Sequence, residues 1–236
     1  MATFLVAHGA WTAGWGWKKM HPLLRAAGHR LVTPTLTGLG ERAHLASPEV
    51  GLDTHIQDML GVIAYEDLRD LILIGHSYGG MVATGVADRA REQVAQLVYL
   101  DAFVPQDGQS LFDLQPAEAQ AHFRELAKTD GGGWRIPPMA MPVDTPPDDF
   151  AWSNPRRVPQ PLKCFEQKLP LQNGPLTLPR SYIWCRLTAP HNFQRFRDRA
   201  QGAPGWRCHD IEASHNPHIT VPNTLCDLLV RIASPS

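Results

Sequence analysis

The stretch Gly75-His76-Ser77-Tyr78-Gly79 places a serine between two glycines, directly after the apolar run of residues 71–74. This pattern is typical of a sharp turn between a strand and a helix, where the serine backbone is strained and its neighbours must be small. Such a turn lifts the hydroxyl above the edge of the sheet and points the N-terminus of the next helix at developing negative charge. An ordinary glycine-rich turn would share the motif, but the surrounding sequence favours Ser77 as a nucleophile.

A serine nucleophile needs a general base within hydrogen-bond reach, because its hydroxyl is almost fully protonated at neutral pH. Among the 11 histidines, His215 is the best candidate. It lies in the loop Ser214-His215-Asn216-Pro217-His218, after the last expected strand, and it follows Ser77 in chain order. His218 is a weaker rival, and His8, His76 and most of the others are expected to be structural or surface residues.

The elements that must position these side chains alternate along the chain. Short apolar runs and amphipathic segments follow one another over the first hundred residues, which predicts βαβ units and a parallel sheet. The expected fold class is α/β, with a mostly parallel central sheet flanked by helices. We predict strands at residues 4–7, 30–33, 71–75, 94–100, 181–185 and 206–211, and helices at residues 17–27, 54–65, 80–91, 116–128, 193–201 and 222–232.

The pattern changes after Val104-Pro105, because prolines crowd into residues 136–161 and glycines occupy residues 131–133. Phe150, Trp152 and Phe165 give this stretch more apolar surface than a disordered linker usually carries. Long inserted segments are often functional lids. We therefore expect an α/β core formed by residues 1–105 and 179–236, with a cap inserted at residues 106–178.

Length and charge exclude several other classes of protein. The 236 residues suit one α/β domain with an insertion rather than two separate domains. The chain has 22 Lys and Arg against 23 Asp and Glu, so no electrostatic field favours nucleic acid or an anionic membrane. A neutral small molecule is the expected partner, and a homodimer is left open.

The N-terminus and the cysteines bear on location. Residues 1–9 lack the basic region and long apolar stretch of a signal peptide, and no segment reaches transmembrane length, so we predict a cytoplasmic protein. The four cysteines show no CxxC pairing, and buried free thiols are expected, with one disulfide left open. They are Cys164, Cys185, Cys208 and Cys226.

Taken together, the motifs resemble those of the α/β-hydrolase superfamily, and within it the small esterases akin to plant methylesterases and hydroxynitrile lyases. The resemblance spans almost the whole chain. Its carriers are His8-Gly9-Ala10-Trp11 through Trp17, the stretch from Gly75 to Gly80, residues 99–105, and Ser214-His215. It implies that the backbone N–H groups of Ala10 and Tyr78 form the oxyanion hole, and that the base is the histidine immediately after the last strand, His215.

The position of the catalytic acid, the carboxylate that orients the histidine, departs from the family pattern. In the relatives it usually follows the strand that corresponds to residues 181–185, but residues 186–192 contain no carboxylate. The first one after them, Asp198, is expected inside the next helix, facing away. Asp101 ends the strand that follows the serine strand, as the acid does in some lipases of the superfamily, and keeps the chain order. We favour Asp101, with Asp210, Glu212 or a dyad without an acid as alternatives.

The resemblance leaves several chemistries open, because the fold alone does not decide function. The lyases of this group carry a threonine where this chain has Gly9 and a lysine where it has Asn216, so both lyase markers are absent. The leading hypothesis is a serine hydrolase that acts on a small, neutral, partly apolar carboxylic ester or lactone through an acyl-enzyme. The alternative is a ligand-binding protein, or a lyase-like or oxygenase-like member of the same fold.

Aromatic residues are expected to line the substrate pocket, as in most small-molecule sites. Trp11, Phe103 and Trp152 are the main candidates, with Trp134 and Phe150 as further ones. Arg156 and Arg157 could meet a carboxylate, although neighbouring loop arginines are more often solvated. No phosphate loop, metal-ligand cluster or dinucleotide fingerprint is present in the sequence, so we expect no cofactor and no metal.

Overall fold

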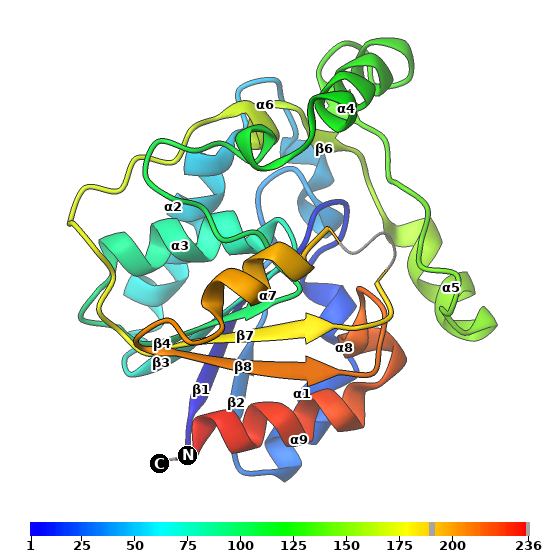
Figure 1. The fold of residues 1–236 in the computed structure, drawn as a ribbon. Helices are drawn as coiled ribbons and strands as arrows, with labels where there is room; N and C mark the ends of the chain where they lie inside the picture. Colours follow the sequence, from blue (N-terminus) through cyan, green and yellow to red (C-terminus); the bar gives the residue numbers. More distant parts are fainter. Residues whose placement is uncertain (189–191, 235–236) are drawn as a thin grey trace.

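The computed structural model describes residues 1–188 and 192–234 of the chain. Its centre is a six-stranded parallel sheet in the order β2-β1-β3-β4-β7-β8 (Figure 1). Each predicted strand is present, with ends that differ by at most one residue, and the α/β fold is confirmed. The strands are β1 (Thr3–Ala7), β2 (Arg30–Val32), β3 (Leu71–His76), β4 (Val94–Leu100), β7 (Arg180–Cys185) and β8 (Trp206–Ile211).

Helices cover both faces of this sheet (Figure 1). α1 (Met20–Ala26) and α9 (Pro222–Ala233) pack on one face, and α2 (Leu52–Tyr65), α3 (Gly79–Arg89) and α7 (Gln194–Ala200) pack on the other. Because both faces are covered, all six residues of the central strand β3 are buried. The continuous apolar run before Ser77 follows from this burial.

One predicted helix differs in its start. Residues 14–17 form a short 3-10 turn, Gly14–Trp17, and the α-helix begins only at Met20. Pro22 lacks a backbone N–H and is tolerated only in the first turn of a helix, so the helix cannot begin much earlier. The expected single helix over residues 17–27 is therefore wrong at its N-terminal end.

Residues 106–178 form an irregular segment beside the core. Figure 1 shows α5 on the side of the molecule toward which the arrows of β7 and β8 point, and α4 at the top of the view, near α6. Ile136, Phe165 and Leu169 anchor the segment, because their side chains are buried in the same core cluster as β3. Its elements are Phe112–Leu114 (3-10), α4 (Ala117–Thr129), β5 (Arg135–Ile136), α5 (Pro147–Ser153), Asn154–Arg156 (3-10), β6 (Gln160–Pro161) and α6 (Lys163–Glu166), with β5 and β6 antiparallel.

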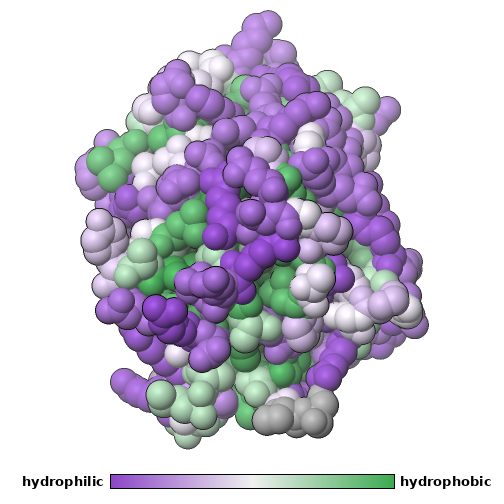
Figure 2. Space-filling model, turned by 90° about the vertical axis from the view of Figure 1, so that its left-hand side faces the viewer, coloured by the Kyte–Doolittle hydropathy of each residue, from purple (hydrophilic) through white to green (hydrophobic). Residues whose placement is uncertain are grey.

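The face in Figure 2 is mostly hydrophilic, and apolar side chains show in hollows between polar ones. Within the described residues, no helix combines the length and the hydropathy needed to span a membrane. All four cysteines are free thiols, so the disulfide left open by the sequence does not form.

Candidate active site

Ser77 occupies the turn between β3 and α3 with a φ of +56°. This left-handed region is uncommon for a residue with a side chain. The turn holds it there: the Ser77 N–H donates to the Leu100 carbonyl at 3.2 Å, and the Ser77 carbonyl accepts from the N–H of Phe103 at 3.2 Å. Gly79 allows the close approach of helix and sheet, because a Cβ on it would lie 2.0 Å from the Ala7 carbonyl oxygen.

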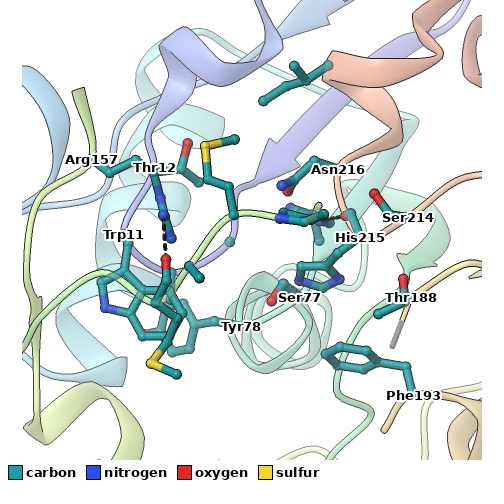
Figure 3. A pocket seen from close by; sticks show the side chains of 18 of the residues that line it. Trp11, Thr12, Ser77, Tyr78, Arg157, Thr188, Phe193, Ser214, His215 and Asn216 are labelled. Atoms are coloured by element: carbon teal, nitrogen blue, oxygen red, sulfur yellow. Dashed lines mark hydrogen bonds between the residues drawn. The ribbon is translucent and has the colours of Figure 1, made fainter. Parts of the chain in front are cut away.

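His215 and Asp101 come from different strands and meet at the edge where Ser77 lies. His215 follows β8, Asp101 directly follows β4, and His215 Nδ1 lies 2.7 Å from Asp101 Oδ2. A carboxylate accepts this hydrogen bond, so Nδ1 carries the proton and Nε2 keeps its lone pair. Figure 3 shows the Ser77 hydroxyl turned toward the His215 ring, in the cavity that both residues line.

Ser77 and His215 share no hydrogen bond in the part of the chain that the structure describes. Such bonds are often loose without substrate and tighten in the complex. The backbone of His215 is held in place independently, because His76 Nε2 donates to the His215 carbonyl at 2.8 Å. The Phe193 ring stacks on the imidazole, with ring centres 5.0 Å apart. The imidazole is therefore fixed beside the serine before substrate arrives.

Asp101 is completely buried and has a φ of +42°. Its Oδ1 accepts from the Cys185 N–H at 3.3 Å, and its Oδ2 accepts from Thr188 Oγ1 at 2.8 Å as well as from His215. These donors compensate a carboxylate that has lost its water. Nothing in the sequence pattern singled out Thr188, which lies in the loop after β7, where the resemblance led us to look first for the acid.

The alternative acids lie elsewhere. Asp210 pairs with Arg197 at 3.1 Å, and Glu212 pairs with Arg186 on the exposed surface. Asp198 is exposed and lies 3.5 Å from Arg197, facing away from the site as expected. Of the loop after β7, residues 189–191 lie outside the described residues. Among the candidate acids, the structure brings Asp101 alone to His215.

Ala10 and Tyr78 both line the same cavity. Neither backbone N–H group has a hydrogen-bond partner among the described residues, so both donors are available to a ligand. Tyr78 is anchored through its side chain, whose hydroxyl bonds to His55 Nδ1 at 2.8 Å. One of these N–H groups, that of Tyr78, lies at the start of α3, and the other, that of Ala10, lies in the loop after β1.

Trp11, next to Ala10, ties this loop to the inserted segment. Its φ is +61°, and its N–H donates to Gln160 Oε1 at 3.3 Å. Its carbonyl accepts from the Val158 N–H at 3.2 Å, and its indole N–H donates to the Ile136 carbonyl at 2.9 Å. No local pattern pointed to Gln160, because the contact joins residues 149 positions apart.

Several buried histidines near the site have lowered pKa values. Burial lowers the pKa of His8 to about 4 and the pKa of His218 to about 3, and it holds the pKa of His76 well below its ordinary value. His218 stacks on Trp17, with ring centres 4.6 Å apart, while Asp101 bonds to His215 instead. These three histidines are therefore uncharged at neutral pH.

The cavity beside Ser77 has a volume of about 710 Å³. Trp11 and Phe103 line it, as expected from the sequence. Trp152, which lies in α5, is not among the lining residues. It packs edge to face against Trp15, which does line the cavity, with ring centres 5.4 Å apart. The pocket role expected for Trp152 is therefore taken by Trp15.

Two further aromatic candidates also lie outside the cavity lining. Phe150 is 46% exposed, and Trp134 carries the guanidinium of Arg135 over its ring at 4.8 Å. In the described residues, no group of three or more His, Cys, Asp or Glu side chains is arranged to hold a metal ion. The site therefore brings together the Ser77 hydroxyl, an imidazole bonded to a buried carboxylate, and the backbone N–H groups of two residues that line the cavity.

Comparison with known proteins places this geometry in context. Residues 4–228 match the model of the Alpha/beta hydrolase family. A carbendazim hydrolyzing esterase from Nocardioides sp. (strain SG-4G) is 42% identical over 98% of this chain and 100% of its own length. A pFDCC methylesterase from Arabidopsis thaliana is 27% identical over 98% of this chain and 94% of its own.

A solved structure agrees in fold over nearly the full length. It is an extracellular alpha/beta-hydrolase from a Paenibacillus species, described as sharing structural and functional homology with Tobacco Salicylic Acid Binding Protein 2. The TM-score is 0.86 at 27% identity, with 98% of each chain covered. The match therefore includes residues 106–178 as well as the sheet.

Proposed function

Since this chain belongs to the alpha/beta hydrolase family, we propose that it hydrolyses carboxylic esters of small, partly apolar molecules through an acyl-enzyme formed on Ser77. Its esterase relatives support carboxylic ester hydrolysis as the reaction class. The observation that carries the mechanism is the 2.7 Å bond from His215 Nδ1 to Asp101 Oδ2, beside a serine held at φ +56°. A serine, a histidine and a buried acid in this relation are the parts that acyl transfer requires.

In the first half-reaction, Ser77 Oγ attacks the ester carbonyl carbon while His215 Nε2 takes the hydroxyl proton. Asp101 keeps Nδ1 protonated and stabilises the imidazolium that forms. The carbonyl oxygen becomes an oxyanion, which the N–H groups of Ala10 and Tyr78 meet. When the tetrahedral intermediate collapses, the bond to the alcohol oxygen breaks and His215 returns the proton to that oxygen.

In the second half-reaction, a water molecule takes the place of the alcohol. His215 Nε2 removes one proton from it, and the resulting hydroxide attacks the acyl carbon. The same two backbone donors stabilise the second oxyanion. Collapse breaks the bond to Ser77 Oγ, which regains its proton from His215, and the carboxylic acid leaves.

Turnover by matched serine variants tests this proposal. The purified protein should hydrolyse p-nitrophenyl acetate and butyrate at neutral pH without added metal, and Ser77→Ala should lose this activity by a factor of about 10⁴ or more. Ser234→Ala, which changes an exposed serine at the end of α9, is the control. Carbendazim and aromatic methyl esters are the next compounds to try, because the relatives are described as acting on carbendazim and as methylesterases.

Trapping the intermediate tests the covalent step separately. A fluorophosphonate should label one peptide, the one that contains Ser77: the serine oxygen displaces fluoride from phosphorus, so the peptide gains the mass of the reagent less that of HF. Ser77→Ala should remain unlabelled. If Ser77→Ala retains full esterase activity, or if the label falls on another serine, the acyl-enzyme proposal fails. If the wild type turns over no ester at all, ligand binding without hydrolysis becomes the better interpretation.

Cyanohydrin cleavage is the second chemistry that the fold could support, and the site disfavours it. A Cβ at Gly9 would lie 3.0 Å from His76 Nδ1 and 3.2 Å from Ser77 Cβ, so a threonine there needs its neighbours to move. Asn216 is uncharged where a lysine would stabilise departing cyanide. We expect no cyanide release from mandelonitrile under conditions in which the esters are hydrolysed.

A further inference from the structure

Arg157 is the one side chain with a permanent positive charge among the described residues that line the cavity. It follows the 3-10 turn Asn154–Arg156 of the inserted segment, and its guanidinium lies over the Trp11 ring, 6.0 Å from the ring centre. Figure 3 shows Arg157 beside Trp11, and Ser77 and His215 on the other side of the cavity. The charge therefore sits at one end of the space that a substrate would occupy.

The described residues accept only part of the hydrogen bonds that the Arg157 guanidinium can donate. Its Nη1 donates to the Met139 carbonyl at 2.6 Å, and no carboxylate of the described residues forms an ion pair with it. Asp144 is the anionic side chain in the described lining, and it is not a partner of Arg157. Burial lowers the pKa of Arg157, because a charged group loses water there without gaining an anion. The remaining N–H donors can serve a ligand.

The position of Arg157 indicates which part of the substrate it would meet. The alcohol must leave next to His215, because His215 Nε2 protonates it. The acyl part is then held on the opposite side, along Trp11 and the oxyanion donors. Arg157 lies over Trp11, so it would contact the far end of the acyl group rather than the alcohol.

We propose that Arg157 forms an anion subsite, and that the preferred substrates are esters whose acyl chain carries a carboxylate at its far end. This inference rests on the proposed function. A planar guanidinium binds a carboxylate through two parallel hydrogen bonds, a geometry that an ammonium or a lone amide does not offer. The substrate would thus be anionic at one end, which departs from the neutral molecule expected from the overall charge.

Two methyl esters of equal chain length test the subsite. Monomethyl adipate carries the distal carboxylate, and methyl hexanoate lacks it. We expect the ratio of their kcat/KM values to favour monomethyl adipate in the wild type, and to fall by roughly tenfold or more in Arg157→Gln, mainly through KM. Arg157→Lys should recover part of the ratio, because it restores the charge without the planar fork.

Arg156→Gln is the matched control, since Arg156 is exposed and its Nη1 bonds to the Trp152 carbonyl outside the cavity lining. It should leave the ratio as in the wild type. An equal loss for both esters in Arg157→Gln would make Arg157 a structural residue and overturn the proposal. The proposal would also fail if the analogue of monomethyl adipate with a neutral amide in place of the carboxylate had the same kcat/KM as monomethyl adipate.

A binding measurement separates this inference from the esterase mechanism. Adipate should raise the Tm of the Ser77→Ala variant, and the rise should disappear when Arg157→Gln is added to it. If neither ester is hydrolysed but this rise is seen, the subsite stands and the proposed function fails. If methyl hexanoate is hydrolysed in a Ser77-dependent manner and adipate has no effect, the subsite alone is wrong.

Discussion

The Thr188 hydroxyl donates a hydrogen bond to the Asp101 oxygen that also accepts from His215. The two distances to Oδ2 are 2.8 Å from Thr188 Oγ1 and 2.7 Å from His215 Nδ1. Thr188 lies in the loop after β7, where the resemblance led us to look first for the acid, and Asp101 directly follows the neighbouring strand β4. The loop after β7 therefore supplies no carboxylate from its described residues. Its Thr188 instead donates a hydrogen bond to the carboxylate that follows β4, the neighbouring strand in the sheet.

Thr188→Val removes this hydroxyl while keeping the shape of the side chain. We expect kcat for p-nitrophenyl butyrate to fall roughly fivefold to tenfold with little change in KM, because the carboxylate loses one of the donors that orient it. Thr188→Ser keeps the donor and should retain most of the wild-type kcat. A loss shared equally by the serine variant, or one confined to KM, would show that Thr188 does not act through Asp101.

Asp101→Asn should lower kcat by about 10³ to 10⁴, because an amide does not hold the His215 imidazole in the tautomer that accepts the serine proton. Asp210→Asn and Glu212→Gln are the controls, since both carboxylates pair with surface arginines. Steady-state kinetics on one ester for all three variants decides between these acids. Wild-type activity in Asp101→Asn would mean that His215 works without this acid.

Gln160→Leu tests the link between the inserted segment and the oxyanion loop. Without Oε1 the Trp11 N–H loses its acceptor, and the loop that carries the Ala10 N–H loses one of its anchors. We expect kcat to fall by roughly tenfold while KM changes less, because a loosened donor weakens transition-state binding. Gln160→Glu keeps an acceptor at this position and should be less affected. Equal effects from both variants would argue for a packing role only.

Gly79→Ala and Gly61→Ala form a matched pair of glycine substitutions in helices. A Cβ at Gly79 would lie 2.0 Å from the Ala7 carbonyl oxygen, whereas a Cβ at Gly61 in α2 would meet nothing within 4 Å beyond its chain neighbours and the backbone of its own helix. Gly79→Ala should destabilise the fold by more than about 3 kcal/mol or prevent folding. Gly61→Ala should stabilise it by about 0.5–1 kcal/mol. Urea denaturation followed by circular dichroism measures both.

We expect the protein to lose stability as the pH falls below about 6.5, because buried histidines resist protonation in the folded state. Burial lowers the pKa of His8 and of His55 to about 4 and the pKa of His218 to about 3, from 6.5 in the unfolded chain. Between pH 6.5 and 4 the unfolded chain therefore binds more protons, so the free energy of unfolding falls as pH falls, by on the order of 3 kcal/mol for each histidine.

Urea denaturation at several pH values between 7 and 4 measures this dependence. His218→Gln should reduce the slope of unfolding free energy against pH by about one proton, whatever its effect on stability at pH 7. A free energy of unfolding that stays constant from pH 7 to pH 5 would contradict the prediction.

The sequence by itself determined the sheet and the turn that carries Ser77. Apolar runs of strand length are local signals, so the ends of β3 and β4 fell within one residue of the expected positions. The glycines around Ser77 are equally local, because a backbone at positive φ and a tightly packed helix require small residues within a few positions. Chain order then pointed to His215, and the short list of carboxylates at strand ends included Asp101.

Only the tertiary structure decided which distant side chains meet. Of Asp101, Asp210 and Glu212, only Asp101 accepts a hydrogen bond from the His215 imidazole. Asp101 follows β4 and His215 follows β8, so this contact depends on how β4, β7 and β8 lie beside one another in the sheet. Gln160 and Arg157 sit in a proline-rich stretch without periodicity, and their roles come from contacts with Trp11 across the inserted segment. Trp152 was misplaced for the same reason: local composition indicates that an aromatic side chain is buried, while packing decides on which side of Trp15 it lies.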